Sequence, residues 1–137
     1  MSEYEKQAQD FLKKFGLKIS ATQRDTNPPA WEEKPEYNRY RYRVKVTRKS
    51  TGKSLSFQFW DSINAYMKNK RPTAYDLLAC LGSESYPQPD FKGFCGDFGY
   101  DEDSRKAHAL WGRVKRFAER INGFFTDAEL EDLREIN

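Results

Sequence analysis

A segment in the first half of the chain alternates strictly between cations and apolar or aromatic residues. It runs over residues 39–46, and its cations are Arg39, Arg41, Arg43 and Lys45. The residues between and after them are Tyr40, Tyr42, Val44 and Val46. Because successive side chains of an extended strand leave opposite faces, the cations line one face and the apolar groups line the other. The segment therefore predicts a strand in a half-buried antiparallel sheet, with a row of positive charge on the surface.

The alternation resumes on both sides of this segment and predicts two further strands. One follows a turn at residues 50–53, and the other lies near the N-terminus. Their apolar positions are Leu55, Phe57 and Phe59 in the later strand and Leu17, Ile19 and Ala21 in the earlier one. The cationic strand and the later strand form a β-hairpin, and the earlier strand completes a three-stranded antiparallel sheet.

Helical signals account for most of the remaining chain. Ser2 and Glu5 have the spacing of a capping box, and the helix that they open is expected to end at Gly16. Four more helices are predicted after Arg71, over residues 73–82, 91–99, 104–122 and 126–136. An N-terminal helix, a three-stranded antiparallel sheet and a C-terminal cluster of about four helices make an α+β fold. We expect it to be a single domain of residues 1–137.

Composition indicates a soluble protein with a core rich in aromatic side chains. The chain is 37% hydrophobic and 15% aromatic. Cys80 and Cys95 lie in apolar helical patterns, where a thiol behaves as a small hydrophobic group. We find no signal peptide and no apolar stretch near 18 residues, so we expect a cytoplasmic protein without a membrane partner.

Charge is distributed in blocks of alternating sign, although the net charge is only +3. Residues 34–71 hold eleven basic residues against two acids, and residues 105–120 hold six against one. Residues 82–104 hold six acids against one lysine, and residues 121–137 hold five against one arginine. Separate patches of this kind steer encounters with charged partners. The alternative is a set of solvated faces whose charges partly cancel in the folded molecule.

No residue pattern specifies a reaction, and we do not expect an enzyme. His108 is the single histidine of the chain, which leaves no second histidine for a metal site or a catalytic triad. Asp101, Glu102 and Asp103 are not followed by the further ligands and closing glutamate of a calcium loop. Their simpler explanation is an acidic helix N-terminus, where negative charge offsets the helix dipole. We therefore expect no cofactor, no metal and no catalytic residue.

Two basic surfaces are predicted. The first is the cationic face of the 39–46 strand, extended at the hairpin turn by Arg48, Lys49 and Lys53. The second is the polar face of the helix from Arg105 to Arg120. Arginine binds phosphates and carboxylates at two points, which suits an anionic partner. The aromatic residues of the strand lie on the opposite, core-facing side, which argues against stacking of single-stranded bases on this face.

Four stretches of the chain carry a resemblance to a known group of proteins. They are residues 5–14, 71–81, 91–106 and 125–136, of which Thr73–Leu81 and Phe94–Lys106 are the most specific. They resemble a family of small uncharacterised proteins that bacteriophages and integrative elements carry. The resemblance implies an accessory protein of a mobile element inside a bacterial cell, and it brings no known reaction. Small proteins of that kind often bind and block a host machine, and anti-CRISPR proteins are the best-known sort.

The residues and the resemblance together predict a non-enzymatic protein that binds and inhibits a bacterial defence complex. The host partner, a protein or a nucleoprotein complex, would meet one of two surfaces. The basic surface, which would suit an acidic partner, is Arg39, Arg41, Arg43 and Lys45. The acidic surface lies in the stretch from Glu84 onward, where it could imitate phosphates, and its residues are Asp97, Asp101, Glu102 and Asp103. The alternative function is direct binding of nucleic acid by the basic sheet face, with an affinity that falls steeply with salt.

Overall fold

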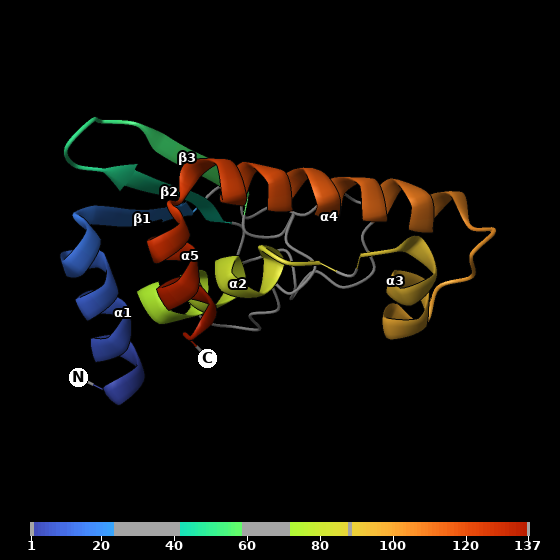
Figure 1. Cartoon of the computed structure of the whole chain (residues 1–137), viewed down its shortest axis with the longest axis horizontal. Coiled ribbons are helices and arrows are strands. Elements are labelled where there is room, and N and C mark those ends of the chain that lie inside the picture. The colour runs from blue at the N-terminus through green and yellow to red at the C-terminus, as the bar shows by residue number, and fades with distance from the viewer. Residues whose placement is uncertain (1, 24–41, 59–71, 88, 137) are drawn as a thin grey trace.

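The computed structural model describes residues 2–23, 42–58, 72–87 and 89–136. Within these ranges the chain forms an N-terminal helix, a three-stranded antiparallel sheet and four further helices, so the predicted α+β fold is confirmed (Figure 1). The elements in chain order are α1 (Glu3–Phe15), β1 (Leu17–Gln23), β2 (Tyr42–Arg48), β3 (Ser54–Gln58), α2 (Ala74–Glu84), α3 (Phe91–Phe98), α4 (Arg105–Phe124) and α5 (Asp127–Arg134).

The sheet has the order β1-β2-β3, and both neighbouring pairs are antiparallel. In β2 the side chains of Tyr42, Val44 and Val46 are buried, whereas those of Arg43 and Lys45 are exposed. The predicted alternation is therefore confirmed for the described part of the cationic segment. Residues 39–41, which include Arg39 and Arg41, lie outside the described residues.

Two hydrophobic clusters hold the described elements together. The main cluster joins the apolar face of the sheet to α1, α2, α5 and the C-terminal half of α4. The second and smaller cluster joins α3 to the N-terminal half of α4 through Phe94, Cys95, Ala107 and Val114. Figure 1 shows α4 running from the sheet at its C-terminal end to α3 at its N-terminal end. Cys80 in the main cluster and Cys95 in the smaller one are both buried thiols.

The glycine that was expected to end α2 lies inside the helix, which continues to Glu84. A Cβ atom on Gly82 would lie 2.6 Å from the carbonyl oxygen of Leu133 in α5. That separation is too short for any side chain. Gly82 therefore allows the backbones of α2 and α5 to approach closely, and it does not terminate the helix.

Helix α4 also continues past its expected end, through Asn122 and Gly123 to Phe124. The amide of Asn122 donates to the carbonyl of Ala118 one turn earlier (2.7 Å) and to the carbonyl of Ser85 beyond the end of α2 (2.8 Å). Asparagine usually favours the end of a helix, because its side chain competes for backbone hydrogen bonds. Here the two bonds keep Asn122 within the helix. It connects α4 to the end of α2.

The helix starts agree closely with the sequence prediction. Complete capping boxes open α2, between Thr73 and Asp76, and α5, between Thr126 and Glu129. At α1 only half of the predicted box forms, because Ser2 accepts from the backbone N–H of Glu5 while the Glu5 carboxylate turns elsewhere. That carboxylate accepts from the side chain of Gln9 (3.1 Å) and from the backbone N–H of Tyr75 (3.4 Å).

Candidate anion-binding surface

The face of the sheet that points away from the helices carries cations that form no ion pair with any described residue. Its exposed cations are Arg43 and Lys45 on β2 and Lys18 on β1. The strand register places Lys45 between Ser20 and Ser56. Arg43 lies opposite Thr22 on β1. Within strands β1, β2 and β3 this face holds no acidic residue. We call Lys18, Arg43 and Lys45 the basic sheet face.

Arg48, which the sequence places at the hairpin turn with the other exposed cations, belongs instead to the interior. Its position in β2 has the same parity as Val44 and Val46, so its side chain leaves the strand on the core side. The guanidinium forms a two-point ion pair with the Glu129 carboxylate, with both N–O distances at 2.7 Å. It also donates to the carbonyl of Phe124 (3.2 Å). Arg48 is therefore unavailable to a partner.

The Arg48–Glu129 pair shifts the pKa of both groups. For Glu129, burial by itself would raise the pKa, but the bonds from Arg48 and from the backbone and hydroxyl of Thr126 outweigh burial and hold the pKa below its ordinary value of 4.5. The hydrogen bond to Glu129 raises the pKa of Arg48, against the opposing effect of burial. Both groups are therefore charged in the folded protein at neutral pH.

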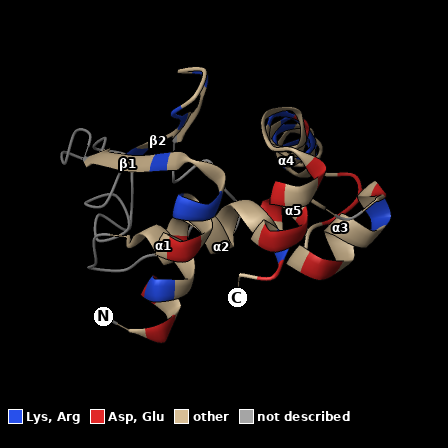
Figure 2. Ribbon diagram, turned by 60° about the vertical axis from the view of Figure 1, so that its left-hand side comes forward, with Lys and Arg blue, Asp and Glu red and all other residues tan. Residues whose placement is uncertain are grey.

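Three arginines on α4 form a second basic surface beside the sheet. Arg113, Arg116 and Arg120 line a cavity of about 250 Å³ together with Phe57 and Phe117. The guanidinium of Arg120 donates to the backbone carbonyl of Ser56 in β3. Because Ser56 lies opposite Lys45 in the register, this bond brings the arginine surface next to the basic sheet face. Figure 2 shows Lys and Arg along α4 and on the strands.

The acidic residues singled out from the sequence lie at the other end of α4. Asp97 is exposed in the last turn of α3. Asp101, Glu102 and Asp103 are exposed in the link to α4. All of them precede the N-cap Ser104, and the first turn of α4 contains no acid, so the predicted acidic helix N-terminus is displaced into the link. The Asp101 carboxylate accepts from the backbone N–H of Asp103 (3.0 Å). With a rise of 1.5 Å per residue, about 24 Å of helix separates Ser104 from Arg120.

The acidic stretch is also shorter than the sequence suggests. Glu84, where the predicted stretch begins, is only 2% exposed. It therefore cannot present its carboxylate to a partner.

Among the residues that the structure describes, no three His, Cys, Asp or Glu side chains gather in a way that could hold a metal ion.

Sequence reasoning missed several contacts around the sheet and along α4. The ion pair of Arg48 and the bond from Arg120 to Ser56 join residues 81 and 64 positions apart, and no local pattern signals such a pairing. His108 stacks on Phe91 with ring centroids 3.9 Å apart, and the ammonium of Lys115 lies 3.8 Å from the centroid of the Trp111 ring. An aromatic ring next to a helix cation at this spacing could have been anticipated from the positions of Trp111 and Lys115 alone.

The chain was compared with protein-family models, curated proteins and solved structures. No protein-family model, no curated protein and no solved structure matches the chain. In the described ranges, no helix is long and apolar enough to cross a membrane.

Proposed function

We propose that this protein is a non-enzymatic accessory protein of a phage or mobile element that binds and inhibits a bacterial defence complex, in the manner of an anti-CRISPR protein. The observation that carries the proposal is the basic sheet face. Lys18, Arg43 and Lys45 lie on one face of the sheet, and their neighbours in the register are uncharged residues, most of which bear a hydroxyl group. Their charge is available to an anionic surface. The mobile-element setting comes from the sequence resemblance.

The basic sheet face supports this function better than the acidic residues do. Glu84 is buried, and the carboxylate of Asp101 is engaged by the backbone of its own loop. Imitation of phosphates would then depend on a few carboxylates in one short link. The basic sheet face, by contrast, is continued by the arginines of α4 through the bond from Arg120 to Ser56. The partner surface is therefore proposed to be acidic or to carry nucleic acid.

Direct nucleic-acid binding is a second candidate, and a separate observation favours it. Three arginines line one cavity next to a sheet face that bears further cations. A basic surface that spans two elements can contact several phosphates at once. Phe57 and Phe117 are only 5% and 8% exposed, so their rings offer no platform for stacked bases. Binding of this kind would be independent of base sequence.

A pull-down from the lysate of the bacterial host, with and without nuclease, separates the two functions. We expect the tagged wild-type protein to retain components of one defence complex, identified by mass spectrometry, and to retain them after nuclease treatment. The variant Arg43→Glu/Lys45→Glu should lose them, because both side chains are exposed and lie on the basic sheet face.

The control is Lys6→Glu/Lys92→Glu, which makes the same change of net charge at exposed positions on α1 and α3. It should retain the complex. Material that disappears with nuclease would support direct nucleic-acid binding instead. Equal retention by the Arg43→Glu/Lys45→Glu variant and by wild type would rule out the basic sheet face as the contact.

A further inference from the structure

The cavity between α4 and β3 combines an apolar lining with a cationic one. Phe57 of β3 and Phe117 of α4 are buried there, with ring centroids 5.1 Å apart. Arg113, Arg116 and Arg120 line the same cavity and are exposed. Its volume of about 250 Å³ lies below the range of about 300–1,000 Å³ that is usual for drug-sized ligands. The cavity therefore suits one charged group and the atoms attached to it, and we call it the arginine cavity.

The sheet holds Arg120 at this cavity. The guanidinium donates through Nη2 to the backbone carbonyl of Ser56, the residue directly before Phe57 in β3. A guanidinium carries several further N–H donors in a fixed fork, and these stay available to a ligand. The bond to the sheet therefore positions the charge of Arg120 without using up its capacity to bind an anion.

A glycine one turn earlier in α4 makes room for Arg116. A Cβ atom on Gly112 would lie 3.2 Å from Nη1 of Arg116 and 3.9 Å from its Cζ atom. The guanidinium therefore lies in the space that a side chain at position 112 would occupy. Glycine in the middle of a helix costs about 1 kcal/mol relative to alanine, so the sequence accepts a less stable helix at the point where Arg116 needs that space.

No carboxylate balances the charges of Arg116 and Arg120. Neither arginine forms an ion pair with a described residue, and this includes Glu119, the single acid of α4. Arg113 already has an interaction of its own, so its charge is not counted toward the site. Like charges four positions apart on a helix repel each other. A bound anion would remove this repulsion.

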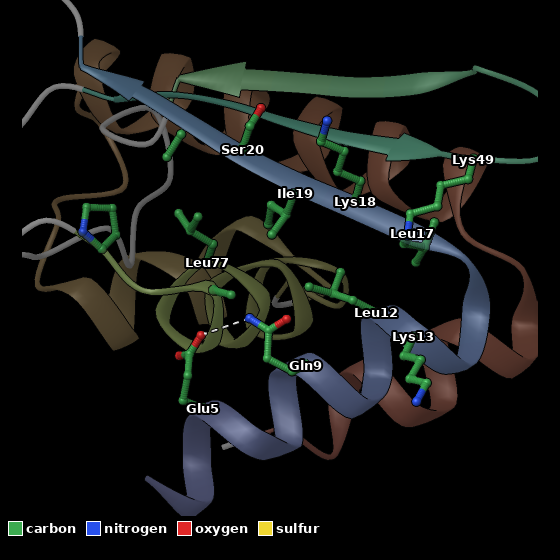
Figure 3. Close-up of a pocket in the computed structure, with 13 residues that line it drawn as sticks. Glu5, Gln9, Leu12, Lys13, Leu17, Lys18, Ile19, Ser20, Lys49 and Leu77 are labelled. Atoms are coloured by element: carbon green, nitrogen blue, oxygen red, sulfur yellow. Dashed lines mark hydrogen bonds between the residues drawn. The ribbon is translucent and has the colours of Figure 1, made fainter. Parts of the chain in front are cut away.

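A larger cavity, of about 820 Å³, lies between β1, α1 and the start of α2 and has a different chemistry (Figure 3). Apolar side chains such as Leu12 and Leu77 line it, together with three lysines and the carboxylate of Glu5, which accepts from Gln9. An anion that entered it would meet this carboxylate. The lining of the arginine cavity, in the described part of the chain, contains no acid. The arginine cavity is therefore the better anion site of the two.

We propose that the arginine cavity binds a phosphomonoester group through Arg116 and Arg120. A guanidinium binds a phosphate through two parallel N–H bonds. A phosphomonoester carries a charge of about −1.5 to −2 at pH 7, which matches two guanidiniums, whereas a carboxylate would match only one. The rings of Phe57 and Phe117 would contact the carbon atoms next to the ester oxygen. Two sources carry this group: the phosphorylated end of a nucleic-acid strand and a free nucleoside monophosphate.

The first test compares AMP with adenosine, which lacks only the phosphate. Isothermal titration calorimetry on the wild-type protein should show AMP binding about tenfold or more tightly than adenosine, because the phosphate contacts supply the affinity.

A short DNA strand distinguishes the two sources of the group. The strand is labelled with fluorescein at one end and carries either a phosphate or a hydroxyl at the other, and anisotropy gives both affinities. If a strand end is the ligand, the phosphorylated strand should bind about tenfold or more tightly than the hydroxyl strand and than AMP, because the chain continues across the neighbouring basic sheet face. If a free nucleotide is the ligand, AMP should bind as tightly as the phosphorylated strand. No preference for phosphate in either comparison would overturn the proposal.

Variants of the protein locate the contact. Arg116→Gln/Arg120→Gln should remove the preference for phosphate, and an unchanged preference would overturn the proposal. The control Arg105→Gln/Lys106→Gln makes the same change of charge at exposed positions in the first turn of α4 and should keep the preference. Arg116→Gln alone should fold as wild type does, because Arg116 forms no ion pair with a described residue, and it should weaken AMP binding about tenfold.

Gly112→Ala tests the geometry without changing a charge. The new methyl group should displace the guanidinium of Arg116 and weaken AMP binding, while the helix preference for alanine keeps the variant folded. Gly123→Ala, on the same helix, has nothing within 4 Å of the new atom and should bind AMP as wild type does. Equal AMP affinities of these two variants would overturn the assignment of Arg116 to the site.

The outcome is separate from that of the proposed function, which is carried by the basic sheet face. Arg43→Gln/Lys45→Gln should leave AMP binding unchanged, because neither residue lines the arginine cavity. Failure of AMP and of the phosphorylated strand to bind would refute the phosphate site alone. Failure of the pull-down to retain a defence complex would refute the proposed function alone.

Discussion

At the scale of single residues, one ion pair joins the β-hairpin to the C-terminal helix. Arg48 ends β2, and Glu129 lies in the first turn of α5, where it also completes the capping box with Thr126. The Glu129 side chain is 2% exposed and that of Arg48 is 19% exposed. A carboxylate buried to this degree is tolerated only when its charge is matched, so loss of either partner leaves an uncompensated group.

The variant Glu129→Gln should lower the free energy of unfolding by about 2 kcal/mol at pH 7, because it removes the charge that Arg48 needs and weakens the cap of α5. The loss should depend on pH. The pKa of Glu129 in the folded protein lies below 4.5, so its contribution is complete above that pH and disappears as the pH falls through the folded-state pKa. Urea unfolding of both proteins between pH 7 and pH 3 measures this.

Glu131→Gln is the matched control for that prediction, since Glu131 lies on the same helix and is exposed. It should change the unfolding free energy by less than about 0.5 kcal/mol at neutral pH. A difference between wild type and Glu129→Gln that stayed constant down to pH 3 would show that the ion pair does not link stability to pH.

Gly82 gives a second prediction at this scale. Gly82→Ala should destabilise the protein by about 1–3 kcal/mol, because the new methyl group would meet the Leu133 carbonyl at 2.6 Å and force α2 and α5 apart. In α4, nothing lies within 4 Å of a Cβ atom at Gly123. There the same change should stabilise by about 0.5–1 kcal/mol, the ordinary helix preference for alanine. Thermal or urea unfolding of the two variants decides whether packing or helix propensity dominates at Gly82.

At the scale of elements, sequence patterns predict the features that depend only on residues close together in the chain. The caps of α2 and α5 and the alternation of β2 each depend on residues a few positions apart, and each is found in the structure. The ends of α2 and α4 depend on distant contacts instead. Gly82 faces α5, and Asn122 bonds to Ser85 beyond α2. A sequence pattern cannot reveal that a glycine or an asparagine has such a partner, so tertiary contacts override the local preference to stop a helix.

The same distinction between local patterns and distant contacts applies to the residues of the candidate site. The exposure of Arg43 and Lys45 follows from strand parity, and the parity of Arg48 in the same strand would also have placed it inside. Its ion pair with Glu129 could not be anticipated, because the partner lies 81 residues away. The burial of Glu84 is equally a product of helix packing, and the sequence alone shows only another acid in an acidic block.

Helix α3 should behave as the least stable element of the described chain. It packs on α4 through the smaller cluster, in which Phe94 is 1% exposed. We predict that Phe94→Ala opens α3 locally, because elements with few buried partners unfold at a lower cost than the global core. Hydrogen exchange should accelerate in residues 91–104 while residues 42–58 keep their protection.

Phe57→Ala is the contrasting variant, since Phe57 packs against Phe117 in the main cluster with ring centroids 5.1 Å apart. It should accelerate exchange in the sheet and the helices together and cost about 3–5 kcal/mol of global stability. If Phe94→Ala accelerated exchange in the sheet to the same extent, the two clusters would form one cooperative unit.

At the scale of the whole molecule, charges of each sign gather in patches, and a basic and an acidic patch both adjoin α4. The surface of Arg113, Arg116 and Arg120 adjoins the basic sheet face, and the acidic link precedes the N-terminal end of α4. A net charge of +3 therefore understates the local field at either end. Segregation of this kind orients an approaching charged partner before contact, and such steering weakens as salt is added.

Salt dependence consequently distinguishes the two candidate functions. If the basic surface binds nucleic acid directly, the logarithm of the association constant for a short DNA duplex should fall linearly with the logarithm of salt concentration. Each phosphate contact contributes about 0.9 to that slope. Arg43→Gln/Lys45→Gln should then reduce the slope by about 1.8. The control Lys6→Gln/Lys92→Gln, at exposed positions on α1 and α3, should leave the slope unchanged.

If the protein is instead an inhibitor that recognises a folded protein surface, it should have little affinity for the free duplex even at low salt. Anisotropy titrations of a labelled duplex across a salt series measure the slope, and an equal slope for both variants would remove the basic sheet face from any role in nucleic-acid binding.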